Sequence, residues 1–363
     1  MNVESSVKER YSRGAQQREE SLCCPVDYDT GLLEMLPEEI VSRDYGCGDP
    51  SRYVHPGDTV LDLGSGGGKI CYMAAQLTGP EGQVIGVDMN DDMLALARKY
   101  QDEMAAKLGS ERVSFVKGNI QDLALDPEAL EHYLAAHPVN NRHSYADLKS
   151  WEQRQRREQP LIADASVDLV ISNCVLNLVS DHEKQQLVQE IHRVLKPGGR
   201  IAIADIISDR PVPATLKNDS ELWSGCLAGA FQEAEFLQSF ADAGFQGVTY
   251  DKWDPQPWRV IDDIVFRSAT LTAVKALPVK TAGKGTALMY RGPFTEVIDD
   301  TGQRFPRGER VTVSATHYAA LTGTAYRDAF IDTEPAQPAA GNSCCGGSTD
   351  ATQPLQAGNV RCC

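Results

Sequence analysis

Ten cysteines in a chain of 363 residues are the side chains with the clearest capacity for chemistry. No Cys-x-x-Cys pair occurs, which excludes a compact zinc knuckle, and a secreted disulfide scaffold would be shorter and denser in cysteine. Three cysteines lie beside glycine or asparagine in the body of the chain, ahead of the tail: Cys47 in DYGCGDP, Cys174 in ISNCVLNLV and Cys226 in ELWSGCLAGAF. Scattered thiols of this kind indicate metal binding, thiol chemistry or core packing. If they act together, the fold must bring them together.

Cys174 has the most informative position, because it follows VDLVISN (167–173), an apolar run that predicts a strand buried on both faces. The carboxyl end of such a strand opens onto the ligand crevice of a doubly wound sheet. We therefore expect Cys174 to lie at the edge of a bound cofactor, with Asn173 and Asn177 beside it. Plain packing is the alternative for a buried cysteine. It is the preferred interpretation for Cys71, which falls within an expected helix.

A glycine loop predicts the cofactor. The segment VLDLGSGGGK carries glycine at positions 64, 66, 67 and 68, between an expected strand and an expected helix. Glycine lets the backbone turn sharply and approach a ligand closely. Asp88 ends the next strand, where its carboxylate can accept hydrogen bonds from a ribose diol. A dinucleotide fingerprint would have glycine where this chain has Lys69, whereas Asp62 ahead of the loop suits S-adenosylmethionine, which needs no pyrophosphate cradle. A tight structural turn is the alternative.

These residues need a regular α/β framework to position them. Strands are expected at 59–63, 83–88, 113–116, 167–173 and 200–207, and helices at 69–77, 91–108 and 182–195. The last of these helices is expected to stop at Lys196-Pro197-Gly198-Gly199. Strands that alternate with helices at this spacing predict a doubly wound, mostly parallel sheet.

The chain divides into five predicted parts: an N-terminal cysteine-bearing helix and loop lead-in (1–58), the cofactor-binding core (59–210), a substrate-binding and sheet-completing part (211–278), a small β-rich domain (279–333) and a tail (334–363). Pro37 is expected to open a helix in the lead-in. An insertion at about 125–162 carries several arginines, but the glutamates beside them favour a solvated helical face over RNA contact. The tail is rich in Pro, Ala, Gly, Ser and Gln, which predicts disorder.

Charge restricts the partners. The chain has 51 acidic and 35 basic residues, a formal charge of −16. This acid excess argues against nucleic acid and against an anionic membrane surface as partners. No run approaches 18 apolar residues, and the polar N-terminus lacks the apolar stretch of a secretory signal. We expect a cytosolic protein with no membrane partner.

Several thiolates beside a methyl sulfonium suit a soft acceptor. Trivalent arsenic takes three sulfurs in a pyramid and keeps a lone pair at the open apex. When that lone pair is aimed at the sulfonium methyl, in line with the departing sulfur, methyl transfer becomes a displacement in which the protein supplies proximity and alignment. No general base is required once thiolates have replaced the arsenic hydroxyls.

The sequence resembles the class I methyltransferases, whose fold is a mostly parallel sheet of seven strands. More narrowly, it resembles the arsenite S-adenosylmethionine methyltransferases. This resemblance is carried by the motifs YGCG (45–48), LDLGSGGGKICY, GVDMN, SNCVLNLV, VLKPGG and LWSGCLAGA. It covers roughly residues 6–278 and extends more weakly over the later β-rich segment.

The resemblance implies roles for particular residues on the cofactor side. It places Asp62, Gly64, Gly66 and Gly68 around the methionine part of S-adenosylmethionine, Asp88 on the ribose, Met89 on the adenine, and Ile120 and Gln121 at the adenine edge. Tyr45 would lie against the sulfonium, where an aromatic face stabilises a cation.

On the acceptor side, the resemblance implies that Cys174 and Cys226 are two arsenic ligands and that Cys47 is a third. Cys23 or Cys24 would form a disulfide with Cys47 during turnover, which would require thioredoxin or glutathione as reductant. The shorter stretch between SLCCP and YGCG leaves open which of the two takes this role.

Two further interpretations stand beside arsenic methylation. One is a class I methyltransferase for another soft metalloid or a small thiol, and the other is a thiol-rich protein that sequesters a metalloid. The intact glycine loop and Asp88 favour an enzyme, because sequestration needs neither. The tail pairs Cys344-Cys345 and Cys362-Cys363 would either capture and hand over arsenic or form a loose metal-binding tail.

Overall fold

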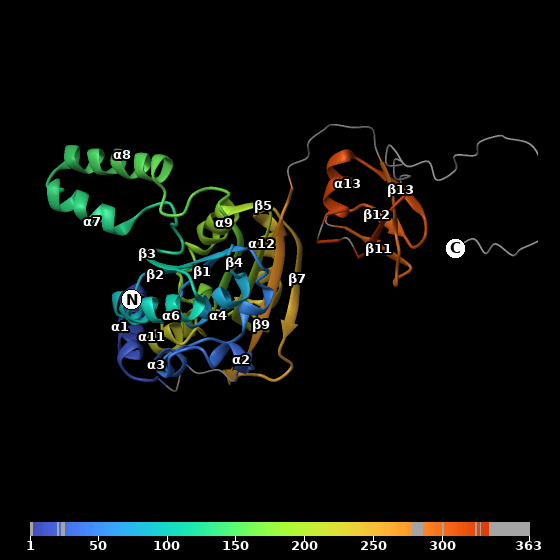
Figure 1. Cartoon of the computed structure of the whole chain (residues 1–363). Helices are drawn as coiled ribbons and strands as arrows, with labels where there is room; N and C mark the ends of the chain where they lie inside the picture. Colours follow the sequence, from blue (N-terminus) through green and yellow to red (C-terminus); the bar gives the residue numbers. More distant parts are fainter. Residues whose placement is uncertain are drawn as a thin grey trace, which may run out of the picture.

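A computed structural model of the chain describes residues 3–19, 22, 26–277, 286–299, 301–323, 325–326 and 328–333. The predictions for Cys23, Cys24 and the tail beyond residue 333 lie outside the described residues. Within them, the chain forms an α/β core, a helical hairpin that projects from it, and a small β-rich unit that follows in the sequence (Figure 1). Among the described residues, no helix is both long and apolar enough to cross a membrane.

The core is a sheet of nine strands, seven of which follow one another in the order β3-β2-β1-β4-β5-β9-β7. The strands are β1 (Thr59–Leu63), β2 (Gln83–Asp88), β3 (Val113–Lys117), β4 (Val167–Asn173), β5 (Leu195–Ser208), β6 (Phe231–Gln232), β7 (Phe245–Trp253), β8 (Arg259–Ile261) and β9 (Ile264–Lys275). Strands β1 to β5 are parallel, and β9 runs antiparallel to β5 and β7. The predicted doubly wound, mostly parallel sheet is confirmed, and the segment 211–278 supplies its antiparallel edge.

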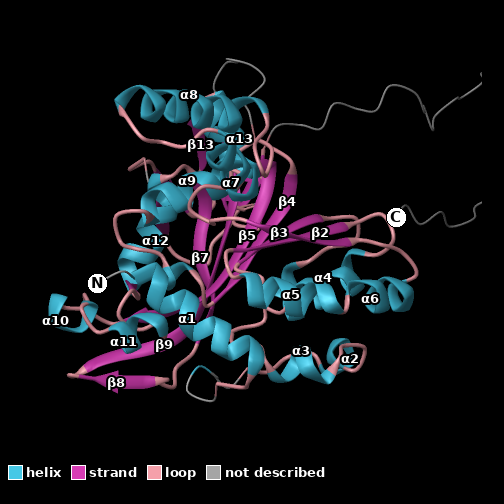
Figure 2. Ribbon diagram, turned by 90° about the vertical axis from the view of Figure 1, so that its left-hand side faces the viewer, coloured by secondary structure: helices cyan, strands magenta, loops and turns pink. Residues whose placement is uncertain are grey.

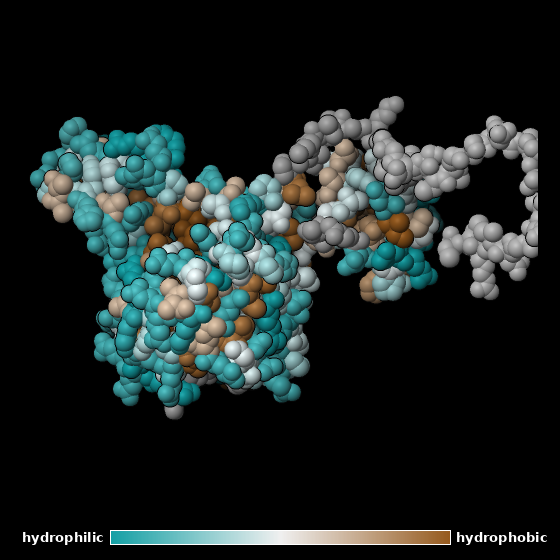
Figure 3. Space-filling view, viewed as in Figure 1, coloured by the Kyte–Doolittle hydropathy of each residue, from teal (hydrophilic) through white to brown (hydrophobic). Residues whose placement is uncertain are grey.

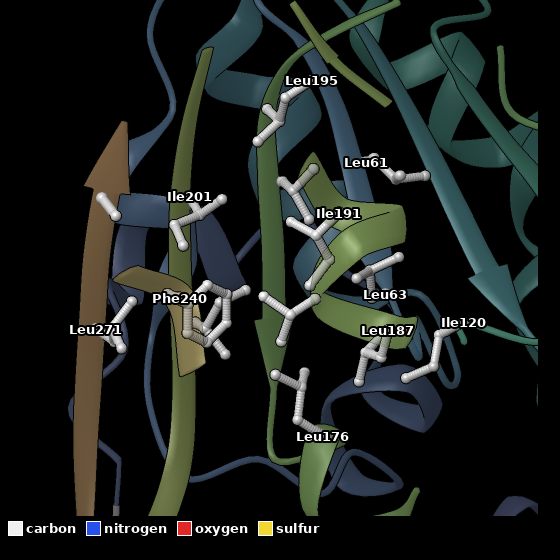
Figure 4. Close-up of a cluster of buried hydrophobic side chains, with 14 of the residues drawn as sticks. Leu61, Leu63, Ile120, Leu176, Leu187, Ile191, Leu195, Ile201, Phe240 and Leu271 are labelled. Atoms are coloured by element: carbon white, nitrogen blue, oxygen red, sulfur yellow. The ribbon is translucent and has the colours of Figure 1, made fainter. Parts of the chain in front are cut away.

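Helices cover both faces of this sheet (Figure 2). One face carries α4 (Lys69–Thr78), α5 (Asp91–Lys99) and α6 (Gln101–Leu108), and the other carries α9 (Lys184–Val194) and α12 (Glu233–Asp242). Apolar side chains fill the space on each side, and Leu63, Leu187 and Ile191 lie between the sheet and α9 (Figure 4). The strands are continuous apolar runs because a sheet covered on both faces has no solvated side.

The N-terminal lead-in wraps around the carboxyl end of the sheet. It consists of α1 (Val3–Gln16), α2 (Thr30–Leu33), α3 (Glu38–Ser42) and a 3₁₀ turn, η2 (Pro50–Tyr53). Pro37 is the residue that precedes α3, as expected. Helix α1 packs against α5 and against α11 (Ser220–Ser224), so one helix spans two elements that are far apart in the sequence.

Two expected elements have different boundaries. The single helix expected at 91–108 is broken at Tyr100, whose ψ of 6° ends α5 before α6 begins. The strand expected to begin at Arg200 begins at Leu195, directly after α9. Lys196-Pro197-Gly198-Gly199 is therefore part of an irregular stretch of β5, where the register against β4 shifts and Gly198 has a φ of +80°. Glycine accommodates this left-handed position within a strand.

The insertion is helical, as predicted. Helices α7 (Pro127–Ala136) and α8 (Arg142–Glu158) form a hairpin that projects from the core (Figure 1), and most of its visible surface is hydrophilic (Figure 3). Tyr133 stacks on Trp151 with the ring centroids 4.5 Å apart, which holds the two helices together. At its base, the N–H of Ile162 donates to the carbonyl of Leu123 at 2.9 Å, so the two ends of the insertion meet.

The β-rich unit contains a sheet of three strands, β10 (Thr286–Tyr290), β13 (Arg310–Val313) and β14 (Phe330–Asp332), together with the pair β11 (Glu296–Ile298) and β12 (Arg304–Pro306) and one helix, α13 (Ala315–Leu321). Leu288, Tyr290 and Phe305 are buried in its own core. This agrees with the predicted small β-rich segment. The boundaries between the five parts of the chain stay predictions.

Candidate active site

A cavity lies at the carboxyl ends of β1, β2 and β4, where the doubly wound fold predicts a ligand. Most of the residues singled out from the sequence line it: Tyr45, Asp62, Gly64, Gly66, Gly67, Asp88, Met89, Ile120, Gln121, Asn173 and Cys174. Gly68 does not line it, and Gly67 does. A Cβ atom on Gly68 would lie 2.7 Å from Phe115, so this glycine allows the loop to pack against β3.

The glycine loop is held to the next strand through Asp88. Gly66 and Asn90 donate their backbone N–H groups to the Asp88 carboxylate, each at 2.8 Å. Burial raises the pKa of Asp88, while these N–H groups act in the opposite direction. Gly64 has a φ of +69°, and a Cβ atom there would lie 2.4 Å from the side chain of Val175. The loop therefore requires glycine, and its shape suits a ligand that sits directly on the backbone.

Asp62 is a buried carboxyl beneath this loop. The Cys71 thiol donates to its Oδ2 at 3.2 Å. Burial raises the pKa of Asp62 to about 8, and Asp44 and Asp88 raise it further. Cys71 is fully buried among apolar side chains, as the packing interpretation requires, but it also satisfies Asp62.

The three cysteines singled out from the sequence come together behind the cavity wall. Cys174 lines the cavity, whereas Cys47 and Cys226 are buried with it in one cluster. The sulfurs of Cys47 and Cys174 and a carboxylate oxygen of Asp205 all lie within 4.8 Å of one another. The Cys226 thiol donates to the Cys174 carbonyl at 3.1 Å.

Two of these cysteines have an unusual backbone. Cys174 has a φ of +64° and Cys226 a φ of +61°. A residue other than glycine held in this left-handed region costs about 1–3 kcal/mol and persists only where its surroundings fix it. Here Ala204 accepts the N–H of Cys174 at 2.8 Å, and the Asn177 amide donates to the Cys226 carbonyl at 3.2 Å. Strain of this kind clusters at functional sites.

Asn173 fixes the Cys47 loop against the end of β4. Its Oδ1 accepts the N–H groups of Cys47 at 2.9 Å and Gly48 at 3.0 Å, and its Nδ2 donates to the Gly48 carbonyl at 2.8 Å. A Cβ atom on Gly46 would lie 2.1 Å from the Asn173 amide. The glycines beside Cys47 therefore allow close packing and do not expose its sulfur, since Cys47 is only 2% exposed.

Tyr11 and Tyr45 form an aromatic corner at the same place. Their ring centroids are 6.1 Å apart with planes at 81°. The Tyr45 hydroxyl donates to the Gly14 carbonyl at 3.0 Å, which anchors its ring beneath α1. The Tyr11 hydroxyl lies 3.8 Å from the sulfur of Cys226, and burial, followed by Cys226 and Cys174, raises the pKa of Tyr11. Tyr11 precedes every motif, so no sequence pattern pointed to it.

Asp205 is the second functional candidate that the sequence reasoning missed. It is completely buried in β5 and accepts hydrogen bonds from the N–H of Ile206 and the amide of Asn177, at 2.8 and 2.7 Å. Burial raises the pKa of Asp205 to about 7. An acidic residue inside the apolar strand RIAIADII is the signal that would have found it, because buried carboxylates are rare unless they have a partner.

This fold and this site are those of an S-adenosylmethionine-dependent methyltransferase. In agreement, the model of the family described as "Methyltransferase domain" matches residues 54–133 and 140–244, and the model of a domain of unknown function matches residues 279–357.

More specific relatives cover most of the chain. It is 32% identical to the arsenite methyltransferase of Aquipseudomonas alcaligenes, over 84% of this chain and 85% of that protein, and 31% identical to the arsenite methyltransferase of Mus musculus, over 83% and 73%. The crystal structure of an arsenic(III) S-adenosylmethionine methyltransferase from Chlamydomonas reinhardtii is similar with a TM-score of 0.56 at 26% identity, over 85% of this chain and 96% of that one. The chain belongs to the arsenite methyltransferase family.

Proposed function

We propose that this protein transfers methyl groups from S-adenosylmethionine to trivalent arsenic, as arsenite or a methylated arsenical, held by the thiolates of Cys47, Cys174 and Cys226. The observation that carries this proposal is the convergence of three buried thiols at the edge of the cofactor cavity. Cys174 is part of the cavity wall, and the other two cysteines are packed with it in one cluster. Soft thiolates favour a soft acceptor over an oxygen or nitrogen nucleophile.

The chain's residues fit the methyl donor. Asp62 faces the cavity where the ammonium group of the methionine part needs an anion, and Asp88, already held by two backbone N–H groups, suits a ribose diol. S-adenosylmethionine, when bound, supplies the methyl group on its sulfonium sulfur. Tyr45 offers an aromatic surface for that positive charge, and Met89, Ile120 and Gln121 offer the surface for the adenine.

Binding of arsenite requires each thiol to replace one arsenic hydroxyl. The thiol proton leaves with that hydroxyl as water, and an arsenic–sulfur bond forms. The arsenic lone pair then forms the new bond to carbon as the carbon–sulfur bond of the donor breaks. Nearby apolar side chains such as Ile206, Leu227 and Phe266 exclude water from the thiols. The protein thus contributes alignment and a dry environment and uses no general base.

The proposal includes a redox partner and a location. Methyl transfer leaves the arsenic formally pentavalent, because its lone pair forms the bond to carbon. The thiols of Cys47 and of Cys23 or Cys24 would return two electrons to it, which restores trivalent arsenic and leaves a disulfide between the two cysteines. Thioredoxin or glutathione would then reduce that disulfide. Such a cycle, and thiols that stay free for arsenic, suit the reducing cytosol.

The test is to incubate the purified chain with arsenite, a thiol reductant and S-adenosylmethionine and to identify the products by chromatography and mass spectrometry. Methylated arsenicals are expected. Cys174→Ser and Cys226→Ser should each reduce the rate at least about 100-fold, because a misplaced acceptor loses alignment. Their affinity for S-adenosylmethionine should stay within about twofold of the unmodified chain's. Arsenite methylation that survives either substitution would exclude that thiol as a ligand.

The same experiment separates the other two interpretations. A methyltransferase for a small thiol would yield a methylated form of the reductant with the arsenic unchanged. A sequestering protein would retain arsenic through its cysteines and consume no S-adenosylmethionine.

A further inference from the structure

A carboxylate lies next to two of the three thiols, and the arsenic chemistry does not use it. The sulfurs of Cys47 and Cys174 and an oxygen of Asp205 lie within 4.8 Å of one another, and all three side chains are buried. Cys226 is not a member of this set, since its thiol donates to the Cys174 carbonyl. Two sulfurs and one carboxylate oxygen form a different set of ligands from the three sulfurs that suit arsenic.

The surroundings of Asp205 lack a positive charge in direct contact. Its carboxylate forms no ion pair within the part of the chain that the structure describes, and its hydrogen-bond partners are N–H groups of Leu176, Asn177 and Ile206. Within the described part of the chain, the Oδ1 atom of Asn177 is also buried without a hydrogen-bond partner. Buried carboxylates in proteins are paired with a cation or coordinate a metal ion. A buried carboxylate beside two thiols therefore favours a cation, and the unsatisfied amide oxygen belongs to a residue that donates to this carboxylate.

We propose that Cys47, Cys174 and Asp205 form a binding site for a thiophilic divalent cation, of which Zn²⁺ fits best. Zinc binds thiolates at about 2.3 Å and carboxylates at about 2.0–2.2 Å in a tetrahedron, which places ligand atoms roughly 3.5–4 Å apart. Small side-chain rotations close the remaining distance from 4.8 Å. Each thiol releases its proton to solvent when it binds the ion. The fourth position falls to water.

Zinc and arsenic then exclude each other, because both require Cys47 and Cys174. This consequence rests on the proposed function, whereas zinc binding itself does not. Zinc is expected to compete with arsenite and not with S-adenosylmethionine, whose pocket is formed by the glycine loop and Asp88. The two ligands differ in their third contact, which is Asp205 for zinc and Cys226 for arsenic.

The test measures zinc binding alone, without arsenite or S-adenosylmethionine. The full-length chain is prepared with serine replacing the six cysteines outside the described residues, at positions 23, 24, 344, 345, 362 and 363. The metal-free protein competes for Zn²⁺ with a chromophoric chelator, and one Zn²⁺ per chain is expected. In this background Cys226→Ser should keep the affinity within about twofold. Cys174→Ser should lose at least about 100-fold, more than the loss of an outer hydrogen-bonding partner costs.

Asp205→Asn should weaken zinc binding about tenfold or more, since it removes a charged ligand of similar shape. Asp209→Asn is the matched control, because Asp209 directly follows the same strand and bonds the Val265 N–H away from the thiols. The proposal is overturned if Cys226→Ser loses zinc as severely as Cys174→Ser, or if folded Asp205→Asn binds like the control. If circular dichroism shows Asp205→Asn unfolded, the two cysteine variants decide alone.

Arsenite methylation by the unmodified, zinc-free chain is measured separately. Its absence together with intact zinc binding would overturn the proposed function and leave the zinc site standing. Methylation by a chain that does not bind zinc would overturn the zinc site and leave the proposed function standing.

Discussion

At the scale of single residues, the site depends on cysteines held where their backbone is strained. Cys174 and Cys226 both have positive φ angles, which residues other than glycine seldom adopt. The hydrogen bonds of Ala204 and Asn177 to these two residues keep them there. The thiols are therefore positioned before any ligand arrives, which lowers the cost of organising an acceptor.

Substitution of Tyr11 tests this positioning of the thiols with the smallest change to the site. Its hydroxyl lies 3.8 Å from the Cys226 sulfur, and Tyr11→Phe removes only this group. A hydrogen bond of about 0.5–1.5 kcal/mol corresponds to a rise of roughly two- to tenfold in the KM for arsenite. The measurement is steady-state kinetics together with calorimetric titration of S-adenosylmethionine, whose affinity should not change.

Tyr100→Phe is the control, because it removes a hydroxyl at the junction of α5 and α6, away from the cavity. An unchanged KM for arsenite in Tyr11→Phe, or an equal rise in the control, would show that the Tyr11 hydroxyl does not act on the thiol.

At the scale of elements, the lead-in helix α1 connects the two halves of the site. Arg10 donates to the Glu221 carbonyl and the Ser224 hydroxyl of α11, two residues ahead of Cys226, at 2.9 and 3.0 Å. The Asn90 amide donates to the Lys8 carbonyl at 3.0 Å on the cofactor side. One helix thus covers both the thiols and the ribose end of the cavity. The α7–α8 hairpin, in contrast, stands away from the cavity and contributes no residue to its lining.

Removal of the hairpin should leave the core intact. The segments that precede and follow the hairpin are already hydrogen-bonded to each other. The N–H of Leu161 donates to the Ala124 carbonyl at 3.3 Å, and the N–H of Ile162 donates to the Leu123 carbonyl at 2.9 Å. Replacing residues 126–159 with a short glycine-containing turn loses two ion pairs to the core, Arg156 with Asp122 and Glu131 with Lys117. Both are partly exposed and each is worth at most about 1 kcal/mol. We expect affinity for S-adenosylmethionine and the methylation rate to stay within about twofold.

The measurements are calorimetric titration and product formation on the shortened chain, with its circular dichroism as the check on folding. A folded variant that has lost methylation would assign the hairpin a part in substrate entry.

At the scale of the whole molecule, the charge distribution combines a strongly acidic surface with carboxyls inside. The chain carries a formal charge of −16, and Asp62 and Asp205 are buried close to the cofactor or the thiols. Burial raises the pKa of Asp62 to about 8 and that of Asp205 to about 7, both from the ordinary value of 3.8. These two groups therefore hold protons in the folded protein that they lose in the unfolded chain near neutral pH.

Their effect on stability follows from this difference in bound protons. Between about pH 4 and pH 8 the folded state binds more protons than the unfolded state, so these carboxyls make the free energy of unfolding fall as pH rises. Lys117 lowers the pKa of Asp91. Burial raises the pKa of Asp168, but Lys196 and Thr59 lower it by more, so its pKa is also below the ordinary value. These two carboxylates therefore change stability only at lower pH. Asp62→Asn should flatten the decline, as measured by the midpoint of chemical unfolding from pH 6 to pH 8.5.

Cofactor binding should remove the proton from the Asp62 carboxyl, because the ammonium group of S-adenosylmethionine favours the ionised carboxylate. Calorimetric titration in buffers of different ionisation enthalpy should detect proton release near neutral pH that disappears above the pKa of about 8. Asp62→Asn should abolish it. Proton release of the same size in Asp62→Asn would assign the proton to another group.

The sequence by itself determined the sheet, the glycine loop and the identities of the thiols, because these depend on local patterns: apolar runs, glycine spacing and the residues beside each cysteine. Contacts between distant segments were decided only by the tertiary structure. The clamp of Asn173 on the Cys47 loop, the position of Tyr11 over Cys226 and the approach of Asp205 to two sulfurs join residues from 31 to 215 positions apart. No local pattern records such distances, since packing of the whole fold sets them.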